Sequence, residues 1–131
     1  MEARPDPTGD RLLIAGYDEK GFRLRGEIVA GRHDGPLLLH ARSVLTWDGT
    51  LTAEALTALV SVQPPIELVL FGTGTRLQPL PATLRRDLRA RGMAVEPMAT
   101  PAACRTYNLL QGDDRRVAAA LLPAGHQPPP A

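Results

Sequence analysis

A glycine-rich segment is the clearest place for chemistry in this chain. It reads Gly72-Thr73-Gly74-Thr75-Arg76 and follows an apolar run, residues 66–71, in which Glu67 is the one charged residue. If that run is a central strand, the segment lies at its carboxyl end, where α/β proteins place their ligand sites. Glycine amides can approach an anion closely, and the Arg76 guanidinium could hold a carboxylate or a phosphate. The pattern predicts either an anion-binding loop or a tight turn that needs glycine for its backbone freedom.

Two polar residues further along the chain could join this loop. Arg105 and Asn108 are one helical turn apart, so they project from the same side of a predicted helix. They could recognise a ligand, or they could cap neighbouring strand ends, because buried polar groups there need partners. The candidate anion-binding residues are therefore Gly72, Thr73, Gly74, Thr75, Arg76, Arg105 and Asn108.

The sequence gives less support to nucleotide binding, nucleophilic catalysis or metal binding. Leu77 stands where a dinucleotide-binding loop needs its third glycine. Cys104 lies in the first turns of a predicted helix, but a nucleophile needs a base, and the three histidines are distant in sequence, so we expect a buried, inert thiol. We predict no catalytic residue, no metal site and no cofactor, and favour a protein that is not an enzyme. The histidines are His33, His40 and His126.

The first third of the chain is predicted to be mostly β. Short apolar or alternating runs are separated by glycine, aspartate and proline, which is typical of strands joined by turns. The separators include Gly31 and Asp34-Gly35-Pro36. The expected strands are 12–14, 22–25, 28–29, 37–39 and 43–47.

The rest of the chain alternates between helical and strand patterns. Apolar residues at helical spacing predict helices over 53–60, from Pro81 to Gly92, and from Thr100 to about Leu110. Strands are expected at 66–71, 93–95 and 117–122. The strand, helix and strand from 66 to 95 form a βαβ unit, for which we expect a right-handed crossover.

These elements predict an α/β fold with one domain. We expect a single three-layer domain over residues 11–122, with a mixed central sheet, helices on both sides and an N-terminal β meander. Residues 1–10 and 123–131 are expected to be flexible tails because they are rich in proline and polar residues.

Composition narrows the function classes. The chain has 131 residues, a formal net charge of +1 and one cysteine. Basic and acidic residues are nearly balanced in number, so the sequence predicts no basic surface for binding nucleic acid. No apolar run reaches the roughly 20 residues that span a bilayer. A lone cysteine suits a reducing compartment. We therefore expect a cytoplasmic protein without an integral membrane segment, either free or peripheral at the inner membrane.

Several segments together resemble a known family of small domains. The family includes mitochondrial complex I assembly factor three and the adipogenesis-associated Mth-type domain protein. This chain departs from the family's pattern at Ala99, where an acidic residue is usual, and at Asp113-Asp114, where a glutamate often stands. The matching segments are Tyr17, Gly21-Phe22, Trp47, 70–74, 95–100, 102–108 and 116–121.

The resemblance implies a three-layer α/β fold with a mixed sheet and no established catalytic residue. It also implies protein partners, such as respiratory-complex or membrane-insertion subunits. Two functions follow as hypotheses. One is a non-enzymatic interaction domain, such as an assembly factor for respiratory complex I or other membrane proteins, acting as a monomer or homodimer. The alternative is a small-anion-binding domain or an unrecognised enzyme that uses the loop from Gly72 to Arg76.

Overall fold

The central layer is a five-stranded sheet. The computed structural model describes residues 11–26 and 30–127. The strand order is β5-β4-β8-β6-β7, and β6 runs parallel to both β7 and β8, whereas β4 is antiparallel to β8 and β5. The predicted mixed sheet is therefore confirmed. Its strands are β4 (Leu37–Leu39), β5 (Val44–Leu45), β6 (Leu68–Gly72), β7 (Ala94–Met98) and β8 (Val117–Leu121).

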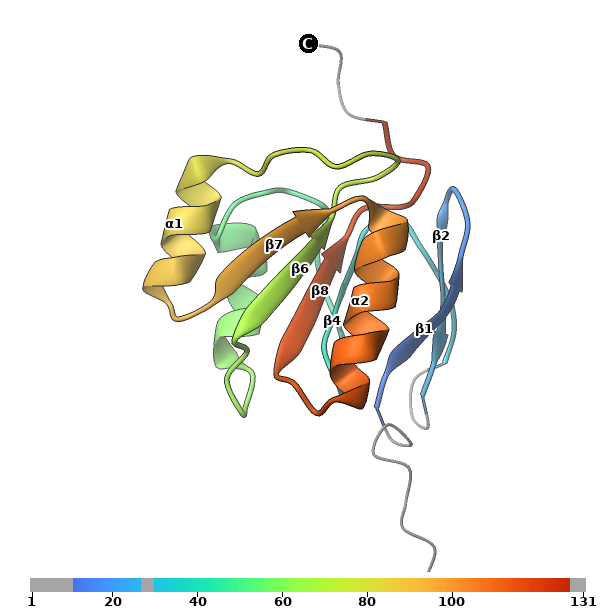
Figure 1. Cartoon of the computed structure of the whole chain (residues 1–131), viewed down its shortest axis with the longest axis horizontal. Coiled ribbons are helices and arrows are strands. Elements are labelled where there is room, and N and C mark those ends of the chain that lie inside the picture. Colours follow the sequence, from blue (N-terminus) through green and yellow to red (C-terminus); the bar gives the residue numbers. More distant parts are fainter. Residues whose placement is uncertain (1–10, 27–29, 128–131) are drawn as a thin grey trace, which may run out of the picture.

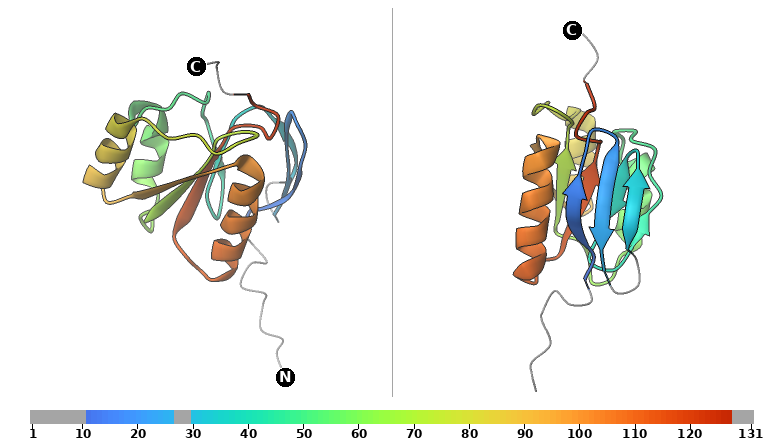
Figure 2. Two further views of the ribbon diagram at one scale, coloured as in Figure 1. Left: turned by 45° about the horizontal axis from the view of Figure 1, so that its top comes forward. Right: turned by 90° about the vertical axis from the view of Figure 1, so that its right-hand side faces the viewer.

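Two outer layers cover this sheet (Figures 1 and 2). One face carries the 3₁₀ helix η1 (Glu54–Ser61) and the helix α1 (Ala82–Ala90). The other face carries the helix α2 (Thr100–Gly112) beside a three-stranded antiparallel sheet. That smaller sheet is the predicted N-terminal meander, with strands β1 (Leu13–Tyr17), β2 (Gly21–Arg25) and β3 (Gly31–Asp34).

The strand β8 divides the apolar interior into two cores. All five of its residues are buried. Ala118 and Ala120 belong to the core under α1 and η1, whereas Ala119 belongs to the core under α2 and the meander. Alternate residues of a strand point to opposite faces, so this pattern is expected of a strand covered on both sides. The small alanines let the outer layers approach the sheet closely.

The helix α2 also holds the meander. Its Tyr107 is fully buried, and the phenolic hydroxyl donates a hydrogen bond of 2.9 Å to the carbonyl oxygen of Leu12. Gln111, also buried, donates from Nε2 to the carbonyl oxygen of Val117 at 3.1 Å. One helix therefore connects β1 with β8, and the outer sheet is fixed to the central one through side chains.

The helix predictions hold for α1 and α2. In α1 the buried residues are Leu84 and Leu88, and Gly92 follows the helix with a φ of +85°, as its position after a helix end predicts. The segment predicted as a helix over 53–60 is instead a 3₁₀ helix, in which Leu56 has a non-helical backbone. Leu56 and Leu59 are nevertheless its buried residues.

One sequence-based prediction is corrected. The strand β3 occupies Gly31–Asp34, a stretch predicted as turns, because pairing with β2 forms a strand despite its polar and mostly exposed residues. Residues 123–127, which the sequence places in a tail, bond to the domain at Gly125, whose N–H donates to the Glu19 carbonyl oxygen at 3.1 Å. The predicted strand at 28–29 and residues 1–10 and 128–131 lie outside the described residues.

Candidate functional site

The predicted loop lies where the parallel strands of the central sheet end. The strand β6 ends at Gly72, next to the end of β8 and the first turn of α2. A Cβ atom on Gly72 would lie 2.8 Å from both a Leu121 methyl carbon and the Thr100 hydroxyl oxygen. Glycine is required at this position because three elements meet there.

Thr100 bonds both to the loop and to the C-terminal segment, residues 122–127, that follows β8. Its hydroxyl is buried, donates to the Leu122 carbonyl oxygen at 2.7 Å and accepts the Gly74 N–H at 2.9 Å. Its own N–H donates to the Gly74 carbonyl oxygen at 2.9 Å. The first turn of α2 is therefore bonded to the strand-end loop on both sides of Gly74.

The loop amides are engaged by protein acceptors. Thr73 N–H donates to the Met98 carbonyl oxygen at 2.8 Å, and Thr75 N–H donates to the His126 carbonyl oxygen at 3.1 Å. The Thr73 hydroxyl lies 2.6 Å from the Arg76 carbonyl oxygen and accepts the Gln78 N–H at 3.0 Å. These contacts satisfy the donors that an anion would need, so anion binding by this loop stays a prediction that the local hydrogen bonding disfavours.

Of the other predicted ligands, Asn108 is bonded to β1 and the two arginines are exposed. Arg76 and Arg105 are exposed. The Asn108 side chain bonds to the main chain of Ile14 on β1, through Nδ2 to the carbonyl oxygen at 2.8 Å and from the N–H to Oδ1 at 2.9 Å. Asn108 thus satisfies main-chain polar groups at the edge of β1. This role is close to the capping of strand ends that the sequence analysis gave as one alternative.

A groove of about 410 Å³ opens beside the loop. Leucine and proline side chains supply most of its lining, and Thr73, Gln78 and His126 add polar groups. Leu77, between the loop and the groove residue Gln78, has a side chain that is 60% exposed. The apolar lining residues are Leu51, Pro79, Leu80, Pro81 and Leu122. Such a groove suits an apolar side chain better than a charged ligand.

The thiol of Cys104 is unsuited to nucleophilic chemistry. The residue is 3% exposed, and its burial raises the pKa of the thiol to about 12, against a small opposing effect of the Arg105 charge. The thiolate is the nucleophilic form, so the group is inert near neutral pH. The prediction of a buried cysteine is confirmed.

One serine and histidine pair escaped the sequence argument. The Ser43 hydroxyl lies 2.9 Å from His40 Nε2, and the Arg42 N–H points at His40 Nδ1 from 3.4 Å. The main-chain N–H of His40 also donates to the Ser43 carbonyl oxygen at 3.2 Å. We therefore assign this pair a structural role in the turn between β4 and β5.

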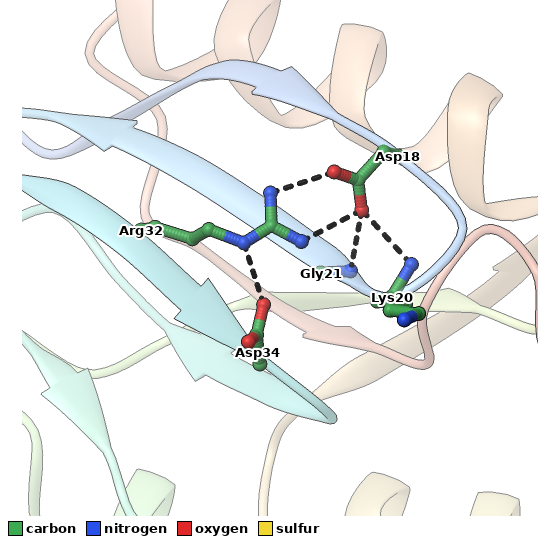
Figure 3. Close-up of polar contacts among 5 residues, drawn as sticks. All are labelled: Asp18, Lys20, Gly21, Arg32 and Asp34. Atoms are coloured by element: carbon green, nitrogen blue, oxygen red, sulfur yellow. Dashed lines mark hydrogen bonds and ion pairs between the residues drawn. The ribbon is translucent and has the colours of Figure 1, made fainter.

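A charged cluster at one end of the meander was also missed (Figure 3). Arg32 Nη1 and Nη2 donate to Asp18 at 2.6 and 2.8 Å, and Nε donates to Asp34 at 2.7 Å. Asp18 Oδ1 also accepts the N–H groups of Lys20 and Gly21. The Arg32 hydrogen bonds hold the pKa of Asp18 well below its usual range. The signal in the sequence was Asp18 three residues before Gly21, a pattern typical of a turn.

Two features are absent from the part of the chain that the structure describes. No helix in residues 11–26 and 30–127 is long and apolar enough to cross a membrane. Within the same residues, no group of three or more histidine, cysteine, aspartate or glutamate side chains is placed to hold a metal ion.

The sequence as a whole decides the family. A family model described as "Protein of unknown function (DUF498/DUF598)" matches residues 14–122, which is most of the chain. The chain belongs to the DUF498/DUF598 family. The resemblance found in its motifs is therefore confirmed, and the matched residues contain the Gly72 loop, the helices α1 and α2, and every groove residue except His126.

Members of the DUF498/DUF598 family with curated names differ in length. An uncharacterized protein of Rhodobacter capsulatus is 40% identical, with 94% of each chain covered. The NADH dehydrogenase (ubiquinone) 1 alpha subcomplex assembly factor 3 of Danio rerio is 35% identical over 85% of this chain. This chain spans 64% of that fish protein, which is less than two thirds of its length.

A solved structure supports the same fold. The solution structure of a Bordetella pertussis protein, described as a Mth938-like domain, has a TM-score of 0.72 and 27% identity. The match covers 97% of this chain and 95% of that one. The mixed α/β fold predicted from the sequence is that of the Mth938-like domains.

Proposed function

We propose that this chain is a non-enzymatic protein-interaction domain with a role in assembling respiratory complex I or another membrane-protein complex. The observation that carries the proposal is 35% identity with a vertebrate protein named as an assembly factor for NADH dehydrogenase. The match extends over 85% of this chain. We place the protein in the cytoplasm, at the inner face of the membrane where such complexes are built.

The groove beside Leu77 is the surface that we assign to the partner. Leucine and proline side chains supply most of its lining, with Pro79 and Pro81 exposed and Leu80 and Leu122 largely buried. Leu77, which precedes the groove residue Gln78 in sequence, is an exposed apolar residue. Burying apolar area is the main favourable contribution to protein association. An exposed apolar region of this kind is typical of an interaction site. We therefore expect a partner that inserts an apolar side chain between Leu80 and Leu122.

The side chains that could carry catalysis support the same proposal. Cys104 is buried with a raised pKa, and the His40 and Ser43 side chains bond to each other within the turn between β4 and β5. The amides of the Gly72 loop already bond to protein oxygens. The features that would argue for an enzyme thus have structural roles in this fold.

The test compares two exposed leucines. Leu77 is 60% exposed beside the groove, and Leu109 is 67% exposed on α2, so neither substitution by glutamate should prevent folding. Tagged wild type, Leu77→Glu and Leu109→Glu are expressed at native level in cells lacking the untagged protein. Identified subunits of NADH dehydrogenase are then quantified by mass spectrometry after gentle solubilisation, together with the enzyme's activity in membranes.

We expect wild type and Leu109→Glu to recover these subunits and to restore NADH dehydrogenase activity, whereas Leu77→Glu should do neither. Arg76→Ala should behave as wild type, because the proposal gives Arg76 no ligand. Normal NADH dehydrogenase activity in cells without the protein would overturn the assembly role. Equal recovery by both leucine variants would overturn the assignment of the groove.

A further inference from the structure

The helix α1 carries a row of basic side chains on its exposed side. Its two leucines are buried in the core, whereas Arg85, Arg86 and Arg89 are exposed. Successive residues of an α-helix are rotated by about 100°, so these three arginines project from one face. Asp87, the acidic residue of the helix, projects from the other flank. We call Arg85, Arg86 and Arg89 the arginine face.

The arginine face has no acidic partner within the domain. Among residues 11–26 and 30–127, no ion pair or side-chain hydrogen bond engages Arg85, Arg86 or Arg89. Like charges three and four residues apart repel each other on a helix, so Arg85 and Arg86 both act against Arg89. Carboxylates supplied by another molecule would relieve this repulsion.

The arginine face begins at the groove assigned to the partner. Pro81 lines that groove, and the Arg85 N–H donates to the Pro81 carbonyl oxygen at 3.2 Å, so Arg85 lies one helical turn beyond Pro81. Arg89 follows one turn later. An α-helix rises about 1.5 Å per residue, so Pro81 and Arg89 are about 12 Å apart along α1. Figure 1 shows how the segment after β6 leads into this helix.

We propose that the partner segment in the groove carries acidic residues next to its apolar anchor, and that the arginine face binds their carboxylates. The inference rests on the proposed function, because it names the chemistry of the partner for the same groove. Guanidinium and carboxylate groups can pair through two parallel hydrogen bonds, which fixes orientation as well as adding attraction. An extended segment advances about 3.3 Å per residue, so acids two and four positions after the anchor reach Arg85 and Arg89.

The surface suits a protein segment better than a lipid bilayer. A single side chain can enter the concave groove beside Pro81, which a flat bilayer surface cannot do. A helix that lies on a membrane exposes large apolar side chains together with its basic ones. The helix α1 lacks them, because its exposed residues besides the arginines are Ala82, Thr83, Asp87 and Ala90.

The test is an NMR titration of the full chain, labelled with ¹⁵N, with three synthetic peptides. The first has one leucine followed by glutamates two and four residues later. The second has lysines in place of the glutamates, and the third has serine in place of the leucine. Vesicles of phosphatidylglycerol are a fourth probe.

Two charge-reversal variants are compared with wild type. One combines Arg85→Glu with Arg89→Glu on α1, and the other combines Arg23→Glu with Arg25→Glu on β2. The second variant is a matched control, because it has the same net charge and its changes lie on the meander. All four arginines are exposed, so we expect both variants to keep the ¹⁵N spectrum of a folded chain.

We expect the glutamate peptide to bind wild type with a Kd at or below about 1 mM, shifting the amides of Leu80, Arg85 and Arg89. The α1 variant should bind this peptide about tenfold or more weakly and should prefer the lysine peptide, whereas the β2 variant should bind as wild type does. The serine peptide should bind more weakly because it lacks the anchor. Raising NaCl from about 0.05 to about 0.3 M should weaken the glutamate peptide.

Three outcomes would overturn the proposal. Equal weakening in both variants would indicate an effect of net charge instead of a site. Equal binding of the glutamate and lysine peptides to wild type would remove the acidic partner. A response to the vesicles without one to the glutamate peptide would assign the arginine face to a membrane surface.

The proposed function has a separate readout. Normal NADH dehydrogenase activity in cells without the protein would overturn the assembly role, even where the glutamate peptide binds as expected. Loss of that activity, with no preference of wild type for the glutamate peptide, would leave the assembly role intact and overturn the arginine face alone.

Discussion

The side-chain amide of Asn108 on α2 pairs with both main-chain polar groups of Ile14 on β1. Nδ2 donates to the Ile14 carbonyl oxygen at 2.8 Å, and Oδ1 accepts the Ile14 N–H at 2.9 Å. Ile14 faces Leu24 of β2 on its other side. Asn108 therefore takes the place of a neighbouring strand at one residue and protects an edge that would otherwise be open.

We expect Asn108→Ala to destabilise the fold. The change leaves the N–H and carbonyl groups of Ile14 without their partner, and each such loss costs about 1 kcal/mol or more. Urea unfolding should show a decrease of about 2 kcal/mol in the free energy of unfolding. Arg105→Ala, an exposed change on the same helix, should alter it by less than about 0.5 kcal/mol. Equal effects would remove the role assigned to Asn108.

Thr100→Val tests the hydroxyl that joins the loop to the C-terminal segment. Valine has nearly the same shape but leaves the Gly74 N–H and the Leu122 carbonyl oxygen without partners in a buried site. We expect a loss of about 2 to 3 kcal/mol in the free energy of unfolding. Thr100→Ser keeps the hydroxyl and should recover most of that loss. If serine is no better than valine, packing and not hydrogen bonding explains Thr100.

Alanine substitutions at two glycines distinguish the cost of steric crowding from the cost of backbone strain. Gly74 and Gly92 both have a positive φ, of 100° and 85°. A Cβ atom on Gly74 would lie 2.3 Å from the His126 carbonyl oxygen, whereas one on Gly92 meets nothing within 4 Å. Gly92→Ala should cost about 1 kcal/mol through strain alone, and Gly74→Ala clearly more.

Hydrogen exchange gives the specific signature of the Gly74 change. The displaced C-terminal segment should release the Thr75 N–H, which bonds to the His126 carbonyl oxygen at 3.1 Å. Thr75 should therefore exchange faster in Gly74→Ala and at the wild-type rate in Gly92→Ala. Unchanged protection of Thr75 in both variants would contradict the packing of residues 123–127 onto the loop.

Alkaline conditions should weaken the fold through Cys104. Its pKa is raised from an ordinary 9.0 to about 12 in the folded chain, so the unfolded chain loses this proton first as the pH rises. The contribution of the thiol to stability is therefore complete below about pH 8 and falls between about pH 9 and 12, by about 2 to 3 kcal/mol at pH 11. Burial raises the pKa of Tyr107 as well and acts in the same direction.

The variant Cys104→Ala measures how much of this pH dependence of the free energy of unfolding is due to the thiol. The variant has its own packing cost at every pH, so the comparison is between slopes of the free energy of unfolding against pH. We expect a shallower decrease above about pH 9 in the variant, with the remainder due to Tyr107 and other groups. Identical slopes would show that the thiol titrates alike in the folded and unfolded chains.

Local signals in the sequence predicted most of the α/β part. The helix α1 has its apolar residues Leu84 and Leu88 at helical spacing and a glycine after its end, so its pattern needs no distant information. The strand β3 lacks such a signal, because Gly-Arg-His-Asp becomes a strand only by pairing with β2. Its identity depends on a neighbour and not on its own side chains.

The position of the glycine loop was predicted from the sequence, but its hydrogen bonding was not. The pattern from Gly72 to Arg76 predicted a loop at a strand end, which the structure contains. The acceptors of its amides are the carbonyl oxygens of Met98 and His126 and the hydroxyl of Thr100. These residues lie far along the chain from the loop, so no local pattern could indicate that the donors are already occupied.

The position of β8 in the sheet has a consequence for how the chain is made. It is the last of the described strands, yet it lies between β4 and β6. Until Leu121 has left the ribosome, nothing joins the β4–β5 pair to the β6–β7 pair, and the two apolar cores stay open to water. Folding of this domain must therefore wait until β8 has emerged, and a nascent chain stalled before Val117 exposes the surfaces that chaperones and proteases recognise.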